Sequence, residues 1–308
     1  MGAVITGWGT SLPDKTITNH DLAARMDTSD EWIVERTGIH ERRVGGTTSG
    51  LAIEAGRQAI ASAGLTPSDI DLLILCTTTP DQTVPATSPV VQDKLGLSCG
   101  AMDLNAACSG FVYGLVAAHG FIALGKKRVL LIGSETLSRI TDWEDRGTAI
   151  LFADGAGAAV VEHTDGPGEL LGWDLGADGS AAGILYADVG ATIHMEGREV
   201  FRRAIRVMVD SGNKSMKAAG ITADQLTLVV PHQANLRIIE SACAKLNIPM
   251  EKAAVVLHRT GNTSSASIPL ALVDALDHGR VKQGDLVLLV GFGAGMTVAS
   301  AVLRWGAR

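Results

Sequence analysis

The 308-residue sequence has few cysteines, few aromatic residues and no excess of basic residues. Its four cysteines, Cys76, Cys99, Cys108 and Cys243, are far apart and form no Cys-x-x-Cys pair. This spacing argues against a zinc site and against a disulfide framework, and it is typical of a reducing compartment. The net charge of −7 argues against a broad nucleic-acid-binding surface. We therefore expect no metal and no nucleic-acid partner.

The sequence also lacks a signal for secretion or for membrane insertion. Its first residues contain no basic region followed by a long apolar run, so we expect no signal peptide and a cytoplasmic location. Two stretches, 105–124 and 286–303, carry no formal charge apart from the titratable His119, but three glycines interrupt each of them. We predict a buried helix and a strand–turn–strand there, and no membrane partner.

Apolar residues and glycines are abundant instead. The chain is 46% hydrophobic with 36 glycines, which is enough for a large core and for two lobes of roughly 150 residues. The halves repeat each other. AGLTPSDIDLLI at 63–74 resembles AGITADQLTLVV at 219–230, and VLLIG at 129–133 resembles VLLVG at 287–291. The offsets, 156 and 158 residues, are nearly constant.

Strand and helix patterns alternate in both halves, which predicts an α/β fold of two duplicated halves related by a pseudo-two-fold axis. We assign residues 1–165 to the N-terminal half and residues 166–308 to the C-terminal half. Asn105, three residues before Cys108, lies 157 residues before Asn262. Because such an axis brings equivalent helix starts together near the centre, we expect Cys108 to lie close to Asn262.

The periodicity of apolar residues predicts the individual elements. We expect strands over 4–8, 71–77, 100–104, 128–133, 149–152, 157–161, 170–174, 227–230, 254–256, 286–290 and 296–303. We expect helices over 19–26, 29–37, 48–63, 87–95, 198–218, 235–246 and 264–277, and a long one directly behind Cys108.

Cys108 is the first candidate catalytic residue. Phe111, Leu115 and Ala118 follow it at helical spacing. A cysteine in the first turn of a helix faces unpaired backbone N–H groups and the positive end of the helix dipole, which favour the nucleophilic thiolate. A free cysteine is also often a small buried core residue, so this stretch alone leaves both interpretations open.

Two further polar positions strengthen the catalytic interpretation. His232 directly follows the apolar strand pattern LTLVV, and Asn262 follows a glycine at the start of a helix. Taken singly, His232 is more often structural and Asn262 an ordinary helix N-cap. Together with Cys108, they supply a nucleophile, a base or donor, and a fixed neutral donor. The glycine-rich FGAG at 292–295 permits backbone N–H groups to approach a thioester oxygen, although it also suits a tight strand connection.

Six segments carry a resemblance to a known family. They are WIVERTGI at 32–39, NAACSGF at 105–111, DRGTAILFADGAGAAVV at 145–161, PHQANLRI at 231–238, GNTSSASIPLAL at 261–272 and GFGAG at 291–295. Together they resemble the β-ketoacyl-ACP synthase III family of condensing enzymes, over almost the whole chain. The resemblance implies a thiolase-like fold with a layered αβαβα core.

The same resemblance implies the roles of the central residues. Cys108 would be the acyl-accepting nucleophile, and His232 and Asn262 would stabilise the enolate formed as malonyl-ACP loses CO₂. The backbone N–H groups of Cys108 and Ala294 would form the oxyanion hole. The family commonly has a glycine at position 294, but the backbone donor survives that change. Asparagine at 262 fits the synthase III group, whereas elongating synthases resemble a Cys–His–His pattern and hydroxymethylglutaryl-CoA synthases use a glutamate.

A CoA entrance and an acyl pocket are also implied by the resemblance. Trp32 and Arg146 would hold the adenine by stacking and cation–π contact, although a tryptophan on a helix is more often core. The other implied CoA-binding residues are Thr28, Arg36, Gly197, Asn235 and Arg237. The implied acyl-pocket residues are Val84, Leu137, Phe152, Met195 and Phe201, each of which also suits ordinary core or surface. Val84 would reach across a dimer interface into the neighbour's pocket.

The implied partners are acyl-CoA, malonyl-ACP and a second copy of the chain in a homodimer, with no cofactor because the CoA thioester is a substrate. A basic rim for the carrier protein would comprise Arg202, Arg203, Arg237 and Lys245, although paired arginines on a helix usually form a solvated face. The chain departs from the family in the short loop between Trp173 and Gly197 and in having Arg198, and both put the size of the acyl donor in doubt.

Three other functions stay open at this stage. A starter-loading synthase of a polyketide or quinolone pathway would use the same residues with another donor or acceptor. The hydrolase interpretation depends on a superficial likeness of the Cys, His and Asn to papain-type sites. The duplicated α/β halves argue against it. A non-catalytic acyl-binding subunit would not need the intact set of three residues.

Overall fold

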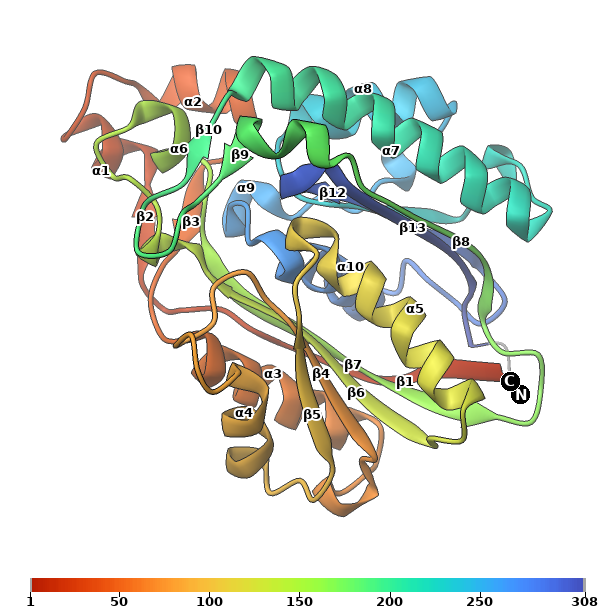
Figure 1. Cartoon of the computed structure of the whole chain (residues 1–308). Helices are drawn as coiled ribbons and strands as arrows, with labels where there is room; N and C mark the ends of the chain where they lie inside the picture. The colour runs from red at the N-terminus through yellow and green to blue at the C-terminus, as the bar shows by residue number, and fades with distance from the viewer. Residues whose placement is uncertain (1, 307–308) are drawn as a thin grey trace.

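Two β-sheets alternate with three helical layers in this chain (Figure 1). The computed structural model describes residues 2–306. The first sheet has the strand order β1 (Gly2–Ser11), β7 (Asp154–Thr164), β6 (Arg128–Thr136), β4 (Leu72–Cys76) and β5 (Gly100–Leu104). The second has the order β8 (Leu170–Gly176), β13 (Thr297–Arg304), β12 (Leu286–Gly293) and β11 (Leu228–Pro231).

The two sheets repeat one pattern. In each, the first three strands pair antiparallel and the next pairs parallel, so that β1, β7, β6 and β4 correspond to β8, β13, β12 and β11. Two short ribbons lie outside the sheets. They pair β2 (Thr16–Thr18) with β3 (Glu41–Arg43), and β9 (Leu185–Tyr186) with β10 (His194–Met195). The predicted α/β class and duplicated halves are confirmed.

Helices fill the space between the sheets and cover both outer faces (Figure 1). Helices α3 (Thr48–Ser62) and α4 (Thr87–Leu95) cover the first sheet, and α7 (Gly197–Ala219) and α8 (Leu236–Leu246) cover the second. Helices α5 (Gly110–Ala123) and α10 (Ser267–Asp277) lie between the sheets and contact both. The predicted αβαβα layering is therefore confirmed. The boundary proposed at residue 165 lies between β7 and β8, and the division into two domains stays a prediction.

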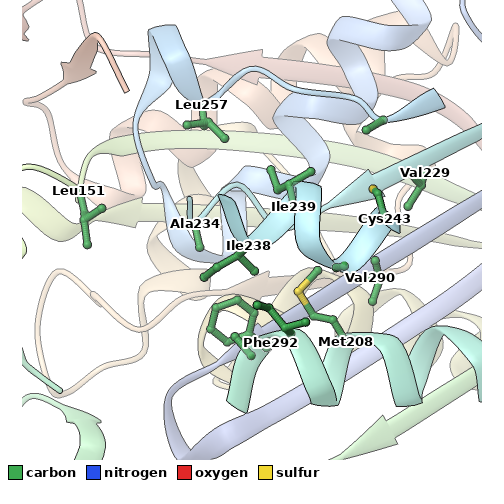
Figure 2. Close-up of a cluster of buried hydrophobic side chains, with 14 of the residues drawn as sticks. Leu151, Met208, Val229, Ala234, Ile238, Ile239, Cys243, Leu257, Val290 and Phe292 are labelled. Carbon is green, nitrogen blue, oxygen red and sulfur yellow. The ribbon is translucent and has the colours of Figure 1, made fainter. Parts of the chain in front are cut away.

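Apolar side chains form three buried clusters: one on the outer face of each sheet, and one that spans the central helices and the inner faces of both sheets. The central layer packs closely because α5 carries glycine where it crosses the first sheet: a Cβ at Gly114 would lie 2.5 Å from the Leu131 side chain. On the far side of the second sheet, Ile238 of α8, Phe292 of β12 and Met208 of α7 pack together (Figure 2). The candidate site lies against this cluster.

Four short helices, α1 (Asn19–Ala23), α2 (Asp30–Thr37), α6 (Arg146–Ala149) and α9 (Leu257–Thr260), gather at one end of the molecule with the two ribbons (Figure 1). The strand expected over 149–152 is wrong. Helix α6 ends at Ala149, and the Ile150 carbonyl accepts bonds of 2.9 and 2.6 Å from the buried Arg42 guanidinium. Only Phe152 forms an isolated bridge, with Asn262.

The strand expected over 254–256 is also wrong, although it stands where β5 stands in the first sheet. Only one isolated bridge, between Val229 and Ala253, marks this place. The buried Gln233 side chain binds this segment instead: it donates to the Ala254 carbonyl at 3.0 Å and accepts from the Val256 amide at 2.9 Å. A side chain thus satisfies backbone groups that a sheet edge would otherwise require.

The two charge-free stretches form buried structure, as expected: α5 lies between the sheets, and β12 and β13 form an antiparallel pair. Between residues 2 and 306, no helix is both long and apolar enough to cross a membrane. Within the same range, no group of three or more His, Cys, Asp or Glu residues is placed to hold a metal ion.

Candidate active site

The fold brings Cys108, His232 and Asn262 to the wall of one cavity of about 690 Å³. Each residue stands just beyond the end of a regular element. Cys108 lies in a 3-10 turn before α5, His232 directly follows β11, and Asn262 follows α9. The layering thus closes sequence separations of 124 and 154 residues from Cys108, and the second of these, to Asn262, is the one that the internal repeat predicts.

Two matched turns set the backbone around the nucleophile. The Asn105 side-chain oxygen accepts from the Ala107 amide at 3.1 Å, and the Asn262 oxygen accepts from the Ser264 amide at 2.9 Å. Ala107 and Ser264 take left-handed φ values of 49° and 48°. This pseudo-two-fold pair shows that the repeat extends to single hydrogen bonds.

The turn at Asn262 also decides which of its side-chain atoms is free to act. Its oxygen is used by Ser264, and its backbone is held by the Leu151 carbonyl and the Ala153 amide at 2.9 Å each. The side-chain NH₂ is therefore the group left for the cavity. Asn262 is a fixed, neutral hydrogen-bond donor in this arrangement.

The resting state of Cys108 differs from the expectation. Its turn precedes α5, so that Cys108 itself lies outside the α-helix. Burial of the sulfur is the largest effect and raises the pKa of the Cys108 thiol to about 12, while the nearby Ser264 side chain acts in the opposite direction. The helix start favours a thiolate, but in this state desolvation outweighs it. Cys108 rests as a thiol at neutral pH.

His232 is buried and neutral. Its Nδ1 lies 2.6 Å from Ser267 Oγ, and the same oxygen accepts from the Gln233 amide at 3.3 Å. The Ser267 proton is therefore directed to Nδ1, and this network assigns the ring proton to Nε2. Burial lowers the pKa of His232 to about 3, and the Phe292 ring packs edge-on at 5.4 Å. His232 is thus a neutral donor toward the cavity.

The end of β12 passes unusually close to the nucleophile. A Cβ placed on Gly293 would lie 2.5 Å from the Cys108 amide nitrogen, closer than any side chain tolerates. Glycine at 293 is therefore required by contact. The next residue, Ala294, lines a second cavity with Cys108. The backbone N–H groups assigned to the oxyanion hole thus belong to adjoining segments.

This close approach yields a first testable prediction. Gly293→Ala is expected to push the Cys108 turn away from β12. If Cys108 is the acyl acceptor that the sequence leads us to expect, the rate of acyl transfer to it should fall by about 100-fold, because preorganised donors are then misplaced. Mass spectrometry of the intact protein after incubation with acetyl-CoA measures the rate. Gly120→Ala on α5 is the control, since a Cβ there meets nothing within 4 Å. Native rates in Gly293→Ala would contradict the role of this contact.

The mouth of the larger cavity is cationic. Three arginines line it, Arg36, Arg198 and Arg237, and no aspartate or glutamate stands among its lining residues within 2–306. Deeper in, the wall is mostly apolar, with Ile150, Leu151 and Phe292 among its residues. Such a tunnel suits a ligand with an anionic head and an apolar arm that reaches Cys108.

Trp32 stands at this mouth between two guanidinium groups. The central carbon of Arg36 lies 4.3 Å from the ring centroid and that of Arg146 lies 4.5 Å from it. Helix α2 fixes Trp32, because the Ser29 hydroxyl accepts from the Trp32 amide at 3.1 Å at the helix start. The opposite wall is tied to α2 by Asn235, whose NH₂ donates to the Arg36 carbonyl at 2.9 Å.

The predicted CoA set is largely gathered at the larger cavity. Trp32, Arg36, Gly197, Asn235 and Arg237 line it. Arg146 lies beside it, over Trp32, and donates to the Asp27 carbonyl at 2.8 Å. Thr28 is not among the lining residues of either large cavity, and its buried hydroxyl has no hydrogen-bond partner in the described part of the chain.

The predicted acyl-pocket set is divided. Leu137 lines the second cavity, of about 450 Å³, and Phe152 lines both cavities, which meet at Cys108, Phe152 and Leu185. Met195 and Phe201 instead line the larger cavity, where the Arg237 guanidinium lies 5.6 Å from the Phe201 ring. Val84 is 81% exposed and lines neither cavity.

The four residues of the predicted basic rim are in different electrostatic situations. Arg202 and Arg203 both bind Glu199, at 2.7 and 2.5 Å, which neutralises part of their charge. Arg237 stands at the cavity mouth, and Lys245 is exposed in the last turn of α8. The free cationic surface is therefore smaller than the sequence predicts.

Several supporting residues were missed by sequence reasoning. Ser267, which orients His232, lies within the segment GNTSSAS, and the serine at the helix start was an available signal. Arg42 holds the loop beside Asn262 through the Ile150 carbonyl, and Gln233 holds the 254–256 segment through the Ala254 carbonyl. No pattern in the sequence marks them, because each acts on residues far away along the chain.

The comparisons with known proteins agree on one family. Residues 102–179 match the family described as 3-oxoacyl-[acyl-carrier-protein (ACP)] synthase III, and residues 216–305 match the family described as its C terminal. A Bacillus anthracis protein named beta-ketoacyl-[acyl-carrier-protein] synthase III 1 is 48% identical over 311 residues, covering 99% of this chain and 100% of its own length.

Two further proteins are similar over the full chain. A Listeria innocua protein named beta-ketoacyl-[acyl-carrier-protein] synthase III is 49% identical over 311 residues, with 99% and 100% of the two chains covered. The crystal structure of 3-oxoacyl-[acyl-carrier-protein] synthase III from Aquifex aeolicus superposes with a TM-score of 0.97 at 45% identity, covering 99% of this chain and 100% of that one.

Proposed function

Because this chain belongs to the β-ketoacyl-[acyl-carrier-protein] synthase III family, we propose that it joins an acyl group from acyl-CoA to malonyl-ACP through acyl-Cys108. The products are β-ketoacyl-ACP, CO₂ and CoA, and the reaction starts fatty-acid synthesis. The chain is thus an acyltransferase of the condensing type. The observation that carries the residue roles is the position of Cys108 at the junction of two cavities, next to two neutral donors.

In the first half-reaction, Cys108 takes the acyl group. Its sulfur forms a bond to the thioester carbon, the bond from that carbon to the CoA sulfur breaks, and the thiol proton ends on CoA. The negative charge that develops on the thioester oxygen meets the backbone N–H groups of Cys108 and Ala294. The Gly293 contact keeps these two segments together.

In the second half-reaction, malonyl-ACP loses its carboxylate as CO₂. The electron pair of the broken C–C bond passes into the thioester as an enolate, whose oxygen accepts from His232 Nε2–H and from the Asn262 NH₂. The enolate carbon then attacks the acyl carbon on Cys108, and the Cys108 sulfur leaves as a thiolate that takes up a proton from water to restore the thiol. A neutral His232 suits this step, because it donates a hydrogen bond to the enolate oxygen and no positive charge has to be buried on the ring.

The residues at the mouth of the larger cavity support a binding site for CoA. Arg36, Arg198 and Arg237 supply positive charge for the phosphate groups of CoA, and the apolar wall accompanies the pantetheine arm. The adenine would enter between Trp32 and Arg146. Because Arg146 rests on the Trp32 ring at 4.5 Å, its guanidinium must move outward when the base inserts.

The acyl chain has its proposed binding site in the second cavity. It begins at Cys108, is lined by Leu137 and Phe152, and its volume of about 450 Å³ is in the range of pockets that enclose drug-sized ligands. We infer that starters longer than acetyl are accommodated in it. A homodimer, docking of the carrier protein at Arg237 and Lys245, and a cytoplasmic location belong to the same proposal.

A panel of acyl-CoA donors of increasing length, each with malonyl-ACP, tests this proposal. We expect CO₂ release and β-ketoacyl-ACP products whose masses grow with the donor, because the second cavity receives the chain. Acyl donors truncated to N-acetylcysteamine are the control: without the nucleotide they should need about tenfold higher concentration. Hydrolysis of the donors without transfer to malonyl-ACP would contradict a condensing enzyme.

A further inference from the structure

Cys108 needs more stabilisation than the groups described so far provide. In the resting site its sulfur is a buried thiol, and two charged or titratable groups face it, Glu135 from β6 and His232 from the end of β11. Glu135 carries negative charge and opposes a thiolate. His232 already carries its proton on Nε2 and, as a buried ring, is poorly suited to accept a second one. The charge that develops on sulfur therefore requires a hydrogen-bond donor.

Ser264 presents such a donor. It is 2% exposed, and it lines the second cavity together with Cys108. Within residues 2–306 its hydroxyl oxygen has no hydrogen-bond partner, so that its proton is not used elsewhere. Ser264 and Cys108 line the same cavity, and the Ser264 side chain favours the charged form of the Cys108 sulfur. Contacts of this kind are often long in an empty site and tighten when charge develops.

The backbone at Ser264 is held in place from two sides. Its φ of 48° lies in the left-handed region, which non-glycine residues rarely adopt, and its amide donates to the Asn262 side chain at 2.9 Å. The neighbouring Ser265 is bound by Glu135, through its hydroxyl at 2.8 Å and its amide at 3.4 Å. Left-handed conformations of this type persist only where surrounding contacts enforce them.

Glu135 is well suited to enforce this conformation. It is fully buried, and its second oxygen accepts five hydrogen bonds from Thr77, Thr78 and Thr79. The carboxylate thus joins the end of β4 to the segment that carries Ser264. All of its partners donate, as an acceptor-only group requires.

We propose that the Ser264 hydroxyl donates a hydrogen bond to the Cys108 sulfur as the thiolate forms, and that Glu135 and Ser265 are positioning residues that hold Ser264 there. The inference rests on the proposed function, because it assigns Ser264 to the acyl-transfer half-reaction. The donor leaves the enolate oxygen untouched, so malonyl decarboxylation does not depend on it.

The test compares Ser264→Ala with the native protein in three measurements. The first is the rate of Cys108 alkylation by iodoacetamide from neutral to alkaline pH, followed by intact mass in a Cys99→Ala background. We expect alkylation and acetyl transfer from acetyl-CoA each to fall about tenfold at fixed pH, as for a rise of one unit in the thiol pKa. Decarboxylation of malonyl-ACP should stay near the native rate.

Further variants separate the hydroxyl from the backbone. Ser264→Gly removes the hydroxyl and also relieves the left-handed conformation, and it should behave like Ser264→Ala. Ser264→Thr restores a hydroxyl and should recover part of the rate. Ser265→Ala should shift the alkylation profile in the same direction by a smaller amount. Ser211→Ala, which removes a buried hydroxyl on α7, should change nothing.

Native alkylation and acetyl-transfer rates in Ser264→Ala would overturn the proposal. So would native rates in Ser264→Gly alone, because the backbone rather than the hydroxyl would then be responsible. If the native protein failed to take an acetyl group from acetyl-CoA, the proposed function would be wrong, while the alkylation profiles would still decide whether Ser264 stabilises the Cys108 thiolate.

Discussion

Cys108→Ala is expected to abolish formation of the acyl-enzyme and to lower the overall condensation rate by at least about 1,000-fold. The reason is the junction at which Cys108 lies. It is the one residue with a nucleophilic side chain that lines both described large cavities, and it is therefore the group best placed to receive the acyl chain there. Intact-mass spectrometry after incubation with acetyl-CoA should show an acetyl adduct on the native protein and none on the variant.

The other cysteines provide the control for this prediction. Cys76 and Cys243 are buried, and burial raises the pKa of each. Cys99 is partly exposed but lines neither large cavity. Cys99→Ala should therefore keep the adduct and the native condensation rate. An acetyl adduct that persists in Cys108→Ala would show that another residue is the acceptor.

His232→Ala and Asn262→Ala are expected to lower malonyl decarboxylation by about 100- to 1,000-fold each, because each removes one donor to the enolate oxygen. Self-acylation of Cys108 should persist in both, since neither residue is required to take the thiol proton permanently. Release of CO₂ from malonyl-ACP and the acetyl adduct on Cys108 are measured in parallel. Equal loss of both half-reactions would contradict this division of roles.

The pH profile sharpens the test of His232. Its pKa is lowered to about 3 by burial, so the ring is neutral throughout the mildly acidic to mildly alkaline range. Decarboxylation by acyl-Cys108 protein should accordingly show no titration near the ordinary histidine pKa, and acid should reduce the decarboxylation rate only as the pH approaches the lowered value.

Ser267→Ala removes the hydrogen bond to His232 Nδ1 and should lower the decarboxylation rate, because the ring can then adopt the other tautomer.

Surface residues of the same types serve as controls for these variants. His278 and Asn213 are exposed on or next to α10 and α7, away from both large cavities. Their replacement by alanine should leave both half-reactions at native rates. Thermal unfolding of His232→Ala and Asn262→Ala confirms that a lost activity reflects the site and not the fold, because both side chains are buried.

Much of this architecture could be predicted from the sequence. The nearly constant offset between the repeated segments predicted the duplicated halves, and the same offset placed Asn262 near Cys108. Local patterns carry this information, because alternation of strands and helices depends on neighbouring residues. Most helices begin and end within a few residues of their expected bounds, as α3 over Thr48–Ser62 does for the expected 48–63.

Two expected strands failed for a common reason. Residues 149–152 and 254–256 have apolar patterns typical of strands, but distant side chains bind their backbone groups, from Arg42 in one case and from Gln233 in the other. Such contacts join residues more than twenty positions apart. No local pattern reports them, and a short strand has too few ladder hydrogen bonds to compete.

The sequence by itself determined that the chain has two duplicated halves and that Cys108, His232 and Asn262 meet at one site. Only the tertiary structure decided their chemical state. Burial makes Cys108 a thiol where the helix start suggested a thiolate, and Ser267 directs the His232 proton to Nε2. Desolvation and hydrogen-bond direction depend on every group around an atom, and those groups come from all parts of the chain.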